Sequence, residues 1–184
     1  MKRWNNICGL ILLWGVIGLI ACNRPANSQS PPGGEKQETA APPLTIFLVR
    51  HAEKGTDGND PDLTEKGMDR AEDISRMLGA IRLDAVYSTP YKRTVQTGTP
   101  AAMSFGLEIQ SYDPRNQDNL VREIEQKYPG GNVLIVGHSN TVPALLSHLD
   151  PAHSYPQMAD NEYDNFYVVT IQGKAVKVVQ LKMP

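Results

Sequence analysis

The strongest constraint on the fold of this 184-residue chain is an uncharged run, residues 44–49, that ends at Arg50 and His51. A short continuous run that is rich in β-branched and aromatic residues predicts a strand buried on both faces of a sheet. Such strands are typical of α/β folds, in which ligands bind outside the carboxyl ends of the strands. We therefore expect Arg50 and His51 to lie where a ligand would bind.

The rest of the domain alternates between strand and helix patterns. Residues 132–137 form a second apolar run, and it also ends at a histidine, His138. Strands alternating with helices predict a mostly parallel sheet with helices on both faces. The sequence Gln172-Gly173-Lys174 between the last two strands favours a hairpin. The expected fold is an α/β three-layer sandwich with an antiparallel C-terminal hairpin.

Element boundaries follow from local signals. Shorter strands are expected at residues 83–87, 107–112, 166–171 and 175–181, and helices after Thr64, over residues 91–105, from Pro114 and after Asn140. Pro90 and Pro114 are expected in the first turn of their helices, because proline suits that position. Gly79 and Gly106 are expected to end the helices that precede them.

Residues 1–22 have the composition of a secretory leader. A basic start precedes an uncharged apolar run at 7–21, which fits a signal peptide better than a membrane span. The ending Leu19-Ile20-Ala21-Cys22 resembles a bacterial lipobox, and this implies cleavage before Cys22 and lipidation of its thiol. An uncleaved anchor helix is the alternative. Both interpretations place the domain outside the cytoplasm, lipid-anchored to a bacterial membrane in the first case, on the periplasmic side in a Gram-negative cell.

Residues 23–43 predict a disordered tether, since they are rich in Pro, Gly, Ser, Gln and Glu and hold no large apolar residue. Residues 44–184 then form one domain. The chain is 40% hydrophobic and 21% charged, which is ordinary for a globular protein. A net charge of −2 provides no basic field that would attract nucleic acid. We expect a monomer that meets the membrane through Cys22.

A second arginine is expected beside the two histidines. Arg93 lies in the first turn of a helix that follows a strand, so it should point to the same edge of the sheet as Arg50 and His51. Two arginines and two histidines would then surround one point in a mildly acidic protein. Such a cluster favours an anionic ligand, and phosphate is the obvious candidate.

Four stretches, residues 48–54, 63–67, 88–97 and 136–141, resemble the histidine phosphatase superfamily, which includes phosphoglycerate mutases and phosphohistidine phosphatases. The compact length resembles the small phosphohistidine-phosphatase-like branch. Ala52 departs from the family's Arg-His-Gly form, and alanine fits there if its φ is negative.

The resemblance implies the roles of the site residues. His51 would attack phosphorus through one ring nitrogen and form a phosphohistidine, while an acceptor such as a backbone carbonyl holds the other nitrogen. Arg50, Arg93 and His138 would bind the phosphate oxygens, with Ser139 as a further phosphate ligand. Water would then hydrolyse the intermediate. No metal and no other cofactor is expected, and the expected substrate is a small phosphate monoester.

The resemblance leaves open which residue donates a proton to the leaving group. The large mutase-type relatives use a carboxylate that follows the second arginine element. Asp113, at the end of the third expected strand, is favoured because strand ends face the site. Asp118 and Glu53 are the alternatives.

Two other classes of function are considered. A non-catalytic lipoprotein could bind an anion with the same cluster. A serine hydrolase could use Ser139, because residues 137–141 lie between a strand and a helix as a nucleophile elbow does, although the usual final glycine is missing. A zinc site is disfavoured: His51 and Glu53 mimic a His-x-Glu start, but no cysteine follows Cys22.

Overall fold

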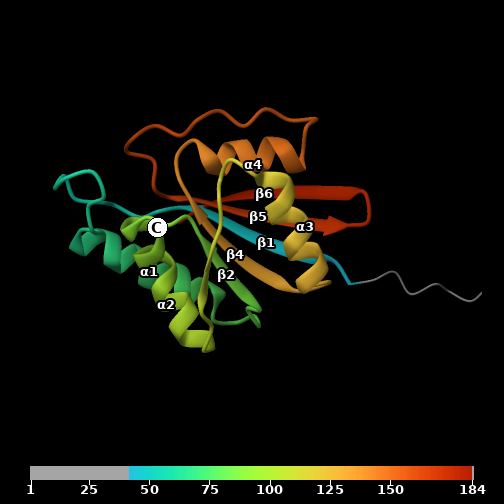
Figure 1. The fold of residues 1–184 in the computed structure, drawn as a ribbon, viewed down its shortest axis with the longest axis horizontal. Helices are drawn as coiled ribbons and strands as arrows, with labels where there is room; N and C mark the ends of the chain where they lie inside the picture. The colour runs from blue at the N-terminus through green and yellow to red at the C-terminus, as the bar shows by residue number, and fades with distance from the viewer. Residues whose placement is uncertain (1–41, 184) are drawn as a thin grey trace, which may run out of the picture. The chain divides into compact units, whose positions relative to one another are not determined.

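The computed structural model describes residues 42–183, so the expected leader, Cys22 and the tether up to residue 41 lie outside the described residues. Within that range the strands form a six-stranded sheet in the order β3-β2-β4-β1-β5-β6 (Figure 1). The strands are β1 (Leu44–Arg50), β2 (Ala85–Ser88), β3 (Ile109–Ser111), β4 (Asn132–Gly137), β5 (Asn165–Gln172) and β6 (Ala175–Lys182). The first four pair in parallel, and β5 and β6 are antiparallel.

Helices cover both faces of the sheet, so the predicted three-layer architecture is confirmed. They are α1 (Glu65–Leu78), α2 (Lys92–Phe105), α3 (Gln117–Lys127) and α4 (Thr141–Leu149). The helices α1 and α2 lie on one side and α3 and α4 on the other (Figure 1). Alternate residues of β1 enter the two cores: Ile46 and Leu48 pack with α3 and α4, while Phe47 and Val49 pack with α1 and α2. This alternation explains why the strand is apolar throughout.

Most helix ends agree with the local signals, and two helix starts do not. Thr64 caps α1 by accepting the N–H of Gly67, and Gly106 ends α2 in the left-handed conformation. The expected starts at Pro90 and Pro114 are wrong. Tyr91 is extended, so α2 begins at Lys92. The side chain of Asn116 accepts the N–H of Asn119, so α3 begins at Gln117.

The register between β1 and β4 brings the two histidines together. Arg50 lies opposite Gly137 in this parallel pair, and the N–H of His51 donates to the carbonyl of Gly137 at 2.9 Å. His51 and His138 therefore leave neighbouring strands at the same edge of the sheet.

Within residues 42–183, none of the helices combines the length and the apolar character that crossing a membrane requires.

Candidate active site

A cavity of about 1090 Å³ opens at the carboxyl ends of the parallel strands. Every site residue expected from the sequence lines it: Arg50, His51, Arg93, Asp113, His138 and Ser139. The remaining wall comes from the segments around Tyr91, Tyr112 and Asn140 and from Lys54 and Asp160. The structure therefore brings the predicted set together in one place, as the parallel strand order requires.

His51 is held as a neutral imidazole with one free ring nitrogen. Its Nδ1 lies 2.8 Å from the carbonyl oxygen of Ala52, so Nδ1 carries the proton and Nε2 keeps its lone pair. The expected backbone acceptor is thus confirmed. Only 3% of the residue is exposed, and burial, together with the nearby charge of Arg50, lowers the pKa of His51 to about 3. The imidazole is unprotonated near neutral pH, which a nucleophile requires.

Arg50 is anchored by the irregular segment that precedes β5. Its Nη1 donates to the carbonyl oxygens of Ala159 and Glu162 at 2.7 and 2.9 Å. The guanidinium carbon lies 4.3 Å from the centre of the Tyr163 ring, a cation–π contact. The Nε of Arg50 is buried without a hydrogen-bond partner among the described residues. A buried donor without a partner is costly, and the guanidinium itself lies at the cavity wall, where its charge would attract an anion.

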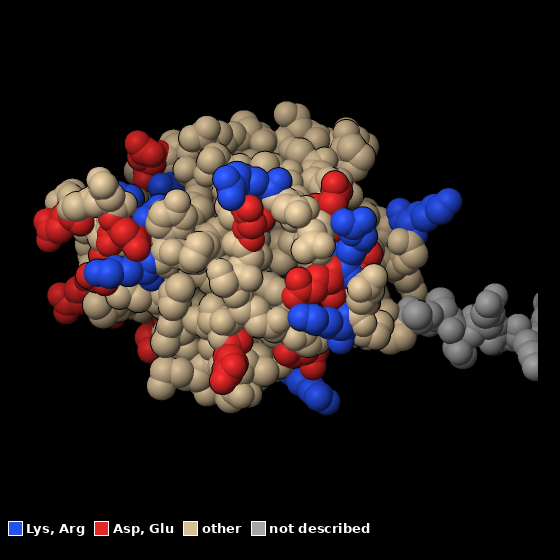
Figure 2. Space-filling model, viewed as in Figure 1, with Lys and Arg blue, Asp and Glu red and all other residues tan. Residues whose placement is uncertain are grey.

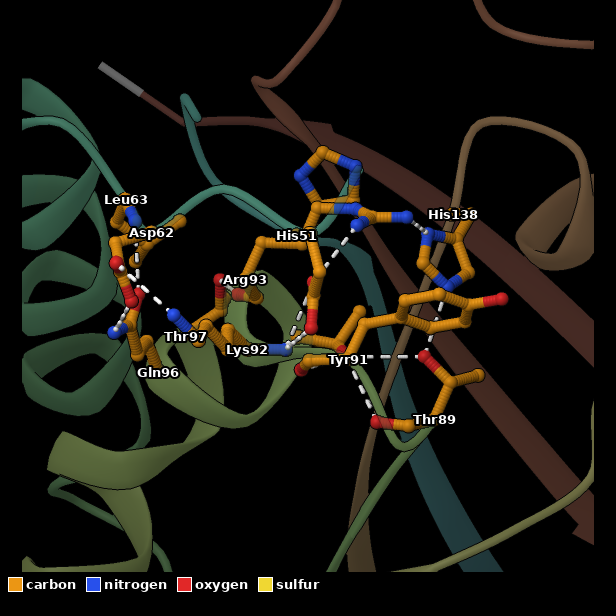
Figure 3. A network of polar contacts seen from close by, with 12 residues as sticks. His51, Asp62, Leu63, Thr89, Tyr91, Lys92, Arg93, Gln96, Thr97 and His138 are labelled. Carbon is orange, nitrogen blue, oxygen red and sulfur yellow. Dashed lines mark hydrogen bonds and ion pairs between the residues drawn. The ribbon is translucent and has the colours of Figure 1, made fainter. Parts of the chain in front are cut away.

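Arg93 is held on the other side of the cluster. Its Nη1 donates to Asp60 Oδ1 at 3.1 Å. Its Nη2 lies 3.5 Å from Nδ1 of His138 (Figure 3). The guanidinium also lies over the ring of Tyr91, 4.5 Å from its centre. The Nε of Arg93, like that of Arg50, is buried and has no partner within residues 42–183.

A chain of hydroxyl groups fixes the tautomer of His138 (Figure 3). The hydroxyl of Thr94 donates to backbone carbonyls, which only accept, so its oxygen must accept the proton of the Thr89 hydroxyl at 3.0 Å. The Thr89 oxygen then accepts from Nε2–H of His138 at 2.8 Å. The lone pair on Nδ1 of His138 therefore faces Arg93. Burial, followed by the charges of Arg93 and Arg50, lowers the pKa of His138 to about 4.

The three candidate proton donors have different surroundings. Asp113 lines the cavity, but the side chain of Arg115 binds its carboxylate at 2.9 and 3.0 Å and lowers its pKa. Asp118 pairs with His148 at 3.1 Å and does not line the cavity. Glu53 lines a separate, smaller cavity, where hydrogen bonds from Arg70 outweigh burial and lower its pKa to about 2. Asp113 is thus the candidate whose position fits, and it is ionised at rest.

The contacts of His138 count against a serine hydrolase. Both of its ring nitrogens face other groups, Thr89 and Arg93. In the described part of the chain, no hydrogen bond involves the side chain of Ser139. Ser139 therefore lacks the adjacent base that activates a serine nucleophile.

Sequence reasoning missed the residues that orient the cluster. These are Asp60, which binds Arg93, Thr89, which binds His138, and Tyr163, which stacks on Arg50. Thr89 stands in the matched stretch 88–97 and could have been considered. The carbonyls of Ala159 and Glu162 have no sequence signal, since every residue carries a backbone carbonyl.

Comparison with known proteins agrees with this geometry. Residues 46–114 match the model of the histidine phosphatase superfamily (branch 1). Phosphoserine phosphatase 1 of Hydrogenobacter thermophilus is 35% identical over 100 residues, which make up 47% of this chain and 47% of that protein. The chain thus spans about half the length of this curated relative.

Solved structures show the histidine phosphatase fold over most of the chain. The protein histidine phosphatase SixA complexed with tungstate aligns with a TM-score of 0.64 and 18% identity, over 75% of this chain and 96% of that one. Phosphoglycerate mutase from Bacillus anthracis str. Sterne aligns with a TM-score of 0.61 and 17% identity, over 79% and 95%. At these identities the likeness concerns the fold. Together the comparisons show a similarity to the histidine phosphatase superfamily.

Proposed function

We propose that this chain hydrolyses phosphate monoesters through a covalent phosphohistidine on His51. One observation carries the proposal: the Nε2 lone pair of His51 is free, while Arg50 and Arg93 flank it with buried donors that have no partner within residues 42–183. A phosphoryl group in the cavity would meet the nucleophile and lie beside the two guanidinium groups that line the cavity.

The proposed first step transfers the phosphoryl group to nitrogen. Nε2 of His51 forms a bond to phosphorus, and the P–O bond to the leaving group breaks with its electron pair on oxygen. Arg50 and Arg93 stabilise the equatorial oxygens as charge spreads over them. Asp113, once protonated, or water supplies the proton that the departing alkoxide needs.

The second step frees the Nε2 lone pair of His51 for another cycle. A water oxygen bonds to phosphorus, the P–N bond breaks with its electron pair on Nε2, and the water proton passes to the base left by the first step. Inorganic phosphate is the product. The positive charges that this chemistry needs come from the two arginines, so the proposal assigns no step to a metal.

The proposed substrate is a small phosphate monoester. One relative, phosphoserine phosphatase 1, supports this class, whereas the neighbour SixA is named for protein phosphohistidine, a phosphoramidate. The test is a panel of O-phosphoserine, other alkyl and aryl phosphates and a phosphohistidine peptide, given to the purified full-length chain with and without a chelator. Release of phosphate in the presence of chelator is expected. Tight phosphate binding without turnover on the whole panel would favour the non-catalytic alternative.

The covalent intermediate gives the sharper test. Rapid quench with labelled substrate should trap an adduct that is labile in acid and stable in base, as phosphohistidine is. The adduct should vanish in His51→Asn and persist in Ser139→Ala, the matched change on the same cavity wall. An adduct on Ser139, or full activity of His51→Asn, would overturn the mechanism.

We also propose that the chain is a lipoprotein anchored through Cys22, on the basis of its Leu-Ile-Ala-Cys ending. Cys22→Ala should change the mobility of the protein on gels and release it from membrane fractions or leave it unprocessed. The matched change Cys8→Ala, inside the leader, should have neither effect. If Cys22→Ala partitions and migrates like the parent, the lipobox interpretation is wrong.

A further inference from the structure

The loop between β1 and α1 is fixed to the start of α2 by two carboxylates. Asp62 accepts from Gln96 Nε2 at 2.8 Å, and its other oxygen lies 3.4 Å from Lys92 Nζ (Figure 3). Asp60 accepts from the backbone N–H of Lys92 at 3.1 and 3.2 Å and from Nη1 of Arg93 at 3.1 Å. The two residues thus make similar contacts with α2, but Asp60 alone of the pair reaches an arginine of the site.

Asp60 lies outside the cavity that holds the proposed chemistry. Arg93 lines the cavity and Asp60 does not, so the carboxylate holds the guanidinium from outside the cavity. A guanidinium is planar and its donors are fixed relative to one another. Once Asp60 fixes Nη1, the directions of the other donors follow: Nη2 lies beside His138, and Nε remains without a partner among the described residues.

We propose that Asp60 is the positioning residue of Arg93: it holds Nη1, keeps Nη2 beside His138 and so keeps the guanidinium at the cavity wall, where the bound phosphoryl group would lie. Its effect on turnover rests on the proposed function, whereas its effect on anion binding does not. Asp60 is itself fixed by the backbone N–H of Lys92, so the orientation of Arg93 is set by the loop and by α2 together.

The sign of the effect separates positioning from simple electrostatics. Removing a carboxylate beside a cationic site makes the site more positive, and by charge alone this strengthens anion binding. Removing the acceptor that orients Arg93 allows the guanidinium to rotate away from the anion, and this weakens anion binding. The two explanations predict opposite changes in the same measurement.

The experiment measures binding of orthophosphate, and of tungstate as a second probe, to the full-length chain by calorimetry. Asp60→Ala is expected to weaken orthophosphate binding about tenfold, the size of a lost hydrogen bond to a charged group. Asp62→Ala is the matched control: it removes loop contacts to α2 without touching Arg93, and about a twofold change or less is expected. Unchanged or tighter binding by Asp60→Ala overturns the proposal, as does an equal loss in both variants.

A double-mutant cycle tests whether Asp60 acts through Arg93. If it does, Asp60→Ala adds no further loss once Arg93→Lys is present, while a general effect on the fold adds its full loss again. Additive losses overturn the proposal. Should Asp60→Ala not fold, Asp60→Asn replaces it in the cycle, because an amide keeps the shape with a single acceptor oxygen.

The same measurements keep the two proposals apart. A parent chain that binds orthophosphate but hydrolyses no ester refutes the proposed function, and the binding cycle still decides the role of Asp60. A parent chain that binds neither probe refutes the positioning of Arg93 toward a phosphoryl group. Equal fractional losses of kcat on aryl and alkyl phosphates are expected in Asp60→Ala, and a selective loss on alkyl phosphates would make Asp60 a proton donor instead.

Discussion

The buried neutral state of His51 makes the stability of the domain depend on pH. Its pKa is lowered from an ordinary value of 6.5 to about 3, chiefly by burial and further by the charges of Arg50, His138 and Arg93. The unfolded chain therefore binds more protons than the folded chain between these two values. Stability must rise with pH through that interval and be lost as the pH falls from 6.5 toward 3.

The expected size follows from the two pKa values. Between pH 7 and pH 4.5 the unfolded imidazole goes from about one quarter protonated to almost fully protonated, while the folded one takes up almost no proton. At about 1.4 kcal/mol per pH unit, this costs the folded state about 2.5 kcal/mol. His138, whose pKa is lowered to about 4, and carboxylates with lowered pKa values, among them Glu53 and Asp164, add losses of the same sign, so the parent alone cannot isolate His51.

Urea unfolding of His51→Asn isolates the contribution. Asparagine keeps a polar side chain and has no proton to gain, so the variant should lose about 2 kcal/mol less than the parent between pH 7 and pH 4.5. The solutions must be free of phosphate, which would stabilise the folded parent by binding. His153→Asn, at an exposed site, is the control and should follow the parent. Equal losses in His51→Asn and the parent would refute the buried neutral imidazole.

Three further changes test the site and its support. Arg93→Lys should lower kcat/KM about a hundredfold, since an ammonium replaces a forked donor; a rate within about twofold of the parent would refute this. Asp113→Asn should slow alkyl phosphates more than nitrophenyl phosphate in steady-state assays, whereas equal losses would reject Asp113 as the acid. Gly67→Ala should lower the free energy of unfolding by about 3 kcal/mol, because its Cβ would collide with the Glu53 carbonyl, while Gly55→Ala, which has room, should not.

The cluster could be predicted because its members occupy strand ends. The runs before His51 and His138 are apolar throughout, which marks them as central parallel strands, and parallel strands end at one edge. Arg93 follows β2, which also pairs in parallel with β4. The residues of the site could therefore be predicted because they follow parallel strands, and the apolar runs mark these strands in the sequence.

The helix starts could not be predicted from proline alone. A proline fixes φ at a value that suits the first helical turn, but the same value suits the turns that precede a helix. At Pro114 the decision lies with Asn116, whose side chain caps α3. At Pro90 the chain stays extended through Tyr91, which places that ring against Arg93 and His138.

The atoms that each cationic side chain presents to the cavity could not be predicted, because loop paths decide them. Arg50 is oriented by two backbone carbonyls more than a hundred positions later in the chain, and Arg93 by a carboxylate from the loop that follows β1. The two anchors differ in one consequence. Carbonyls leave the charge of Arg50 intact at its anchor, whereas Asp60 offsets part of the charge of Arg93 while it fixes the direction of the guanidinium. Arg93 is thus placed for directional hydrogen bonds to an anion, while Asp60 weakens its electrostatic attraction for that anion. A lysine keeps the charge and loses the direction, so Arg93→Lys should lower turnover more than the unchanged charge suggests.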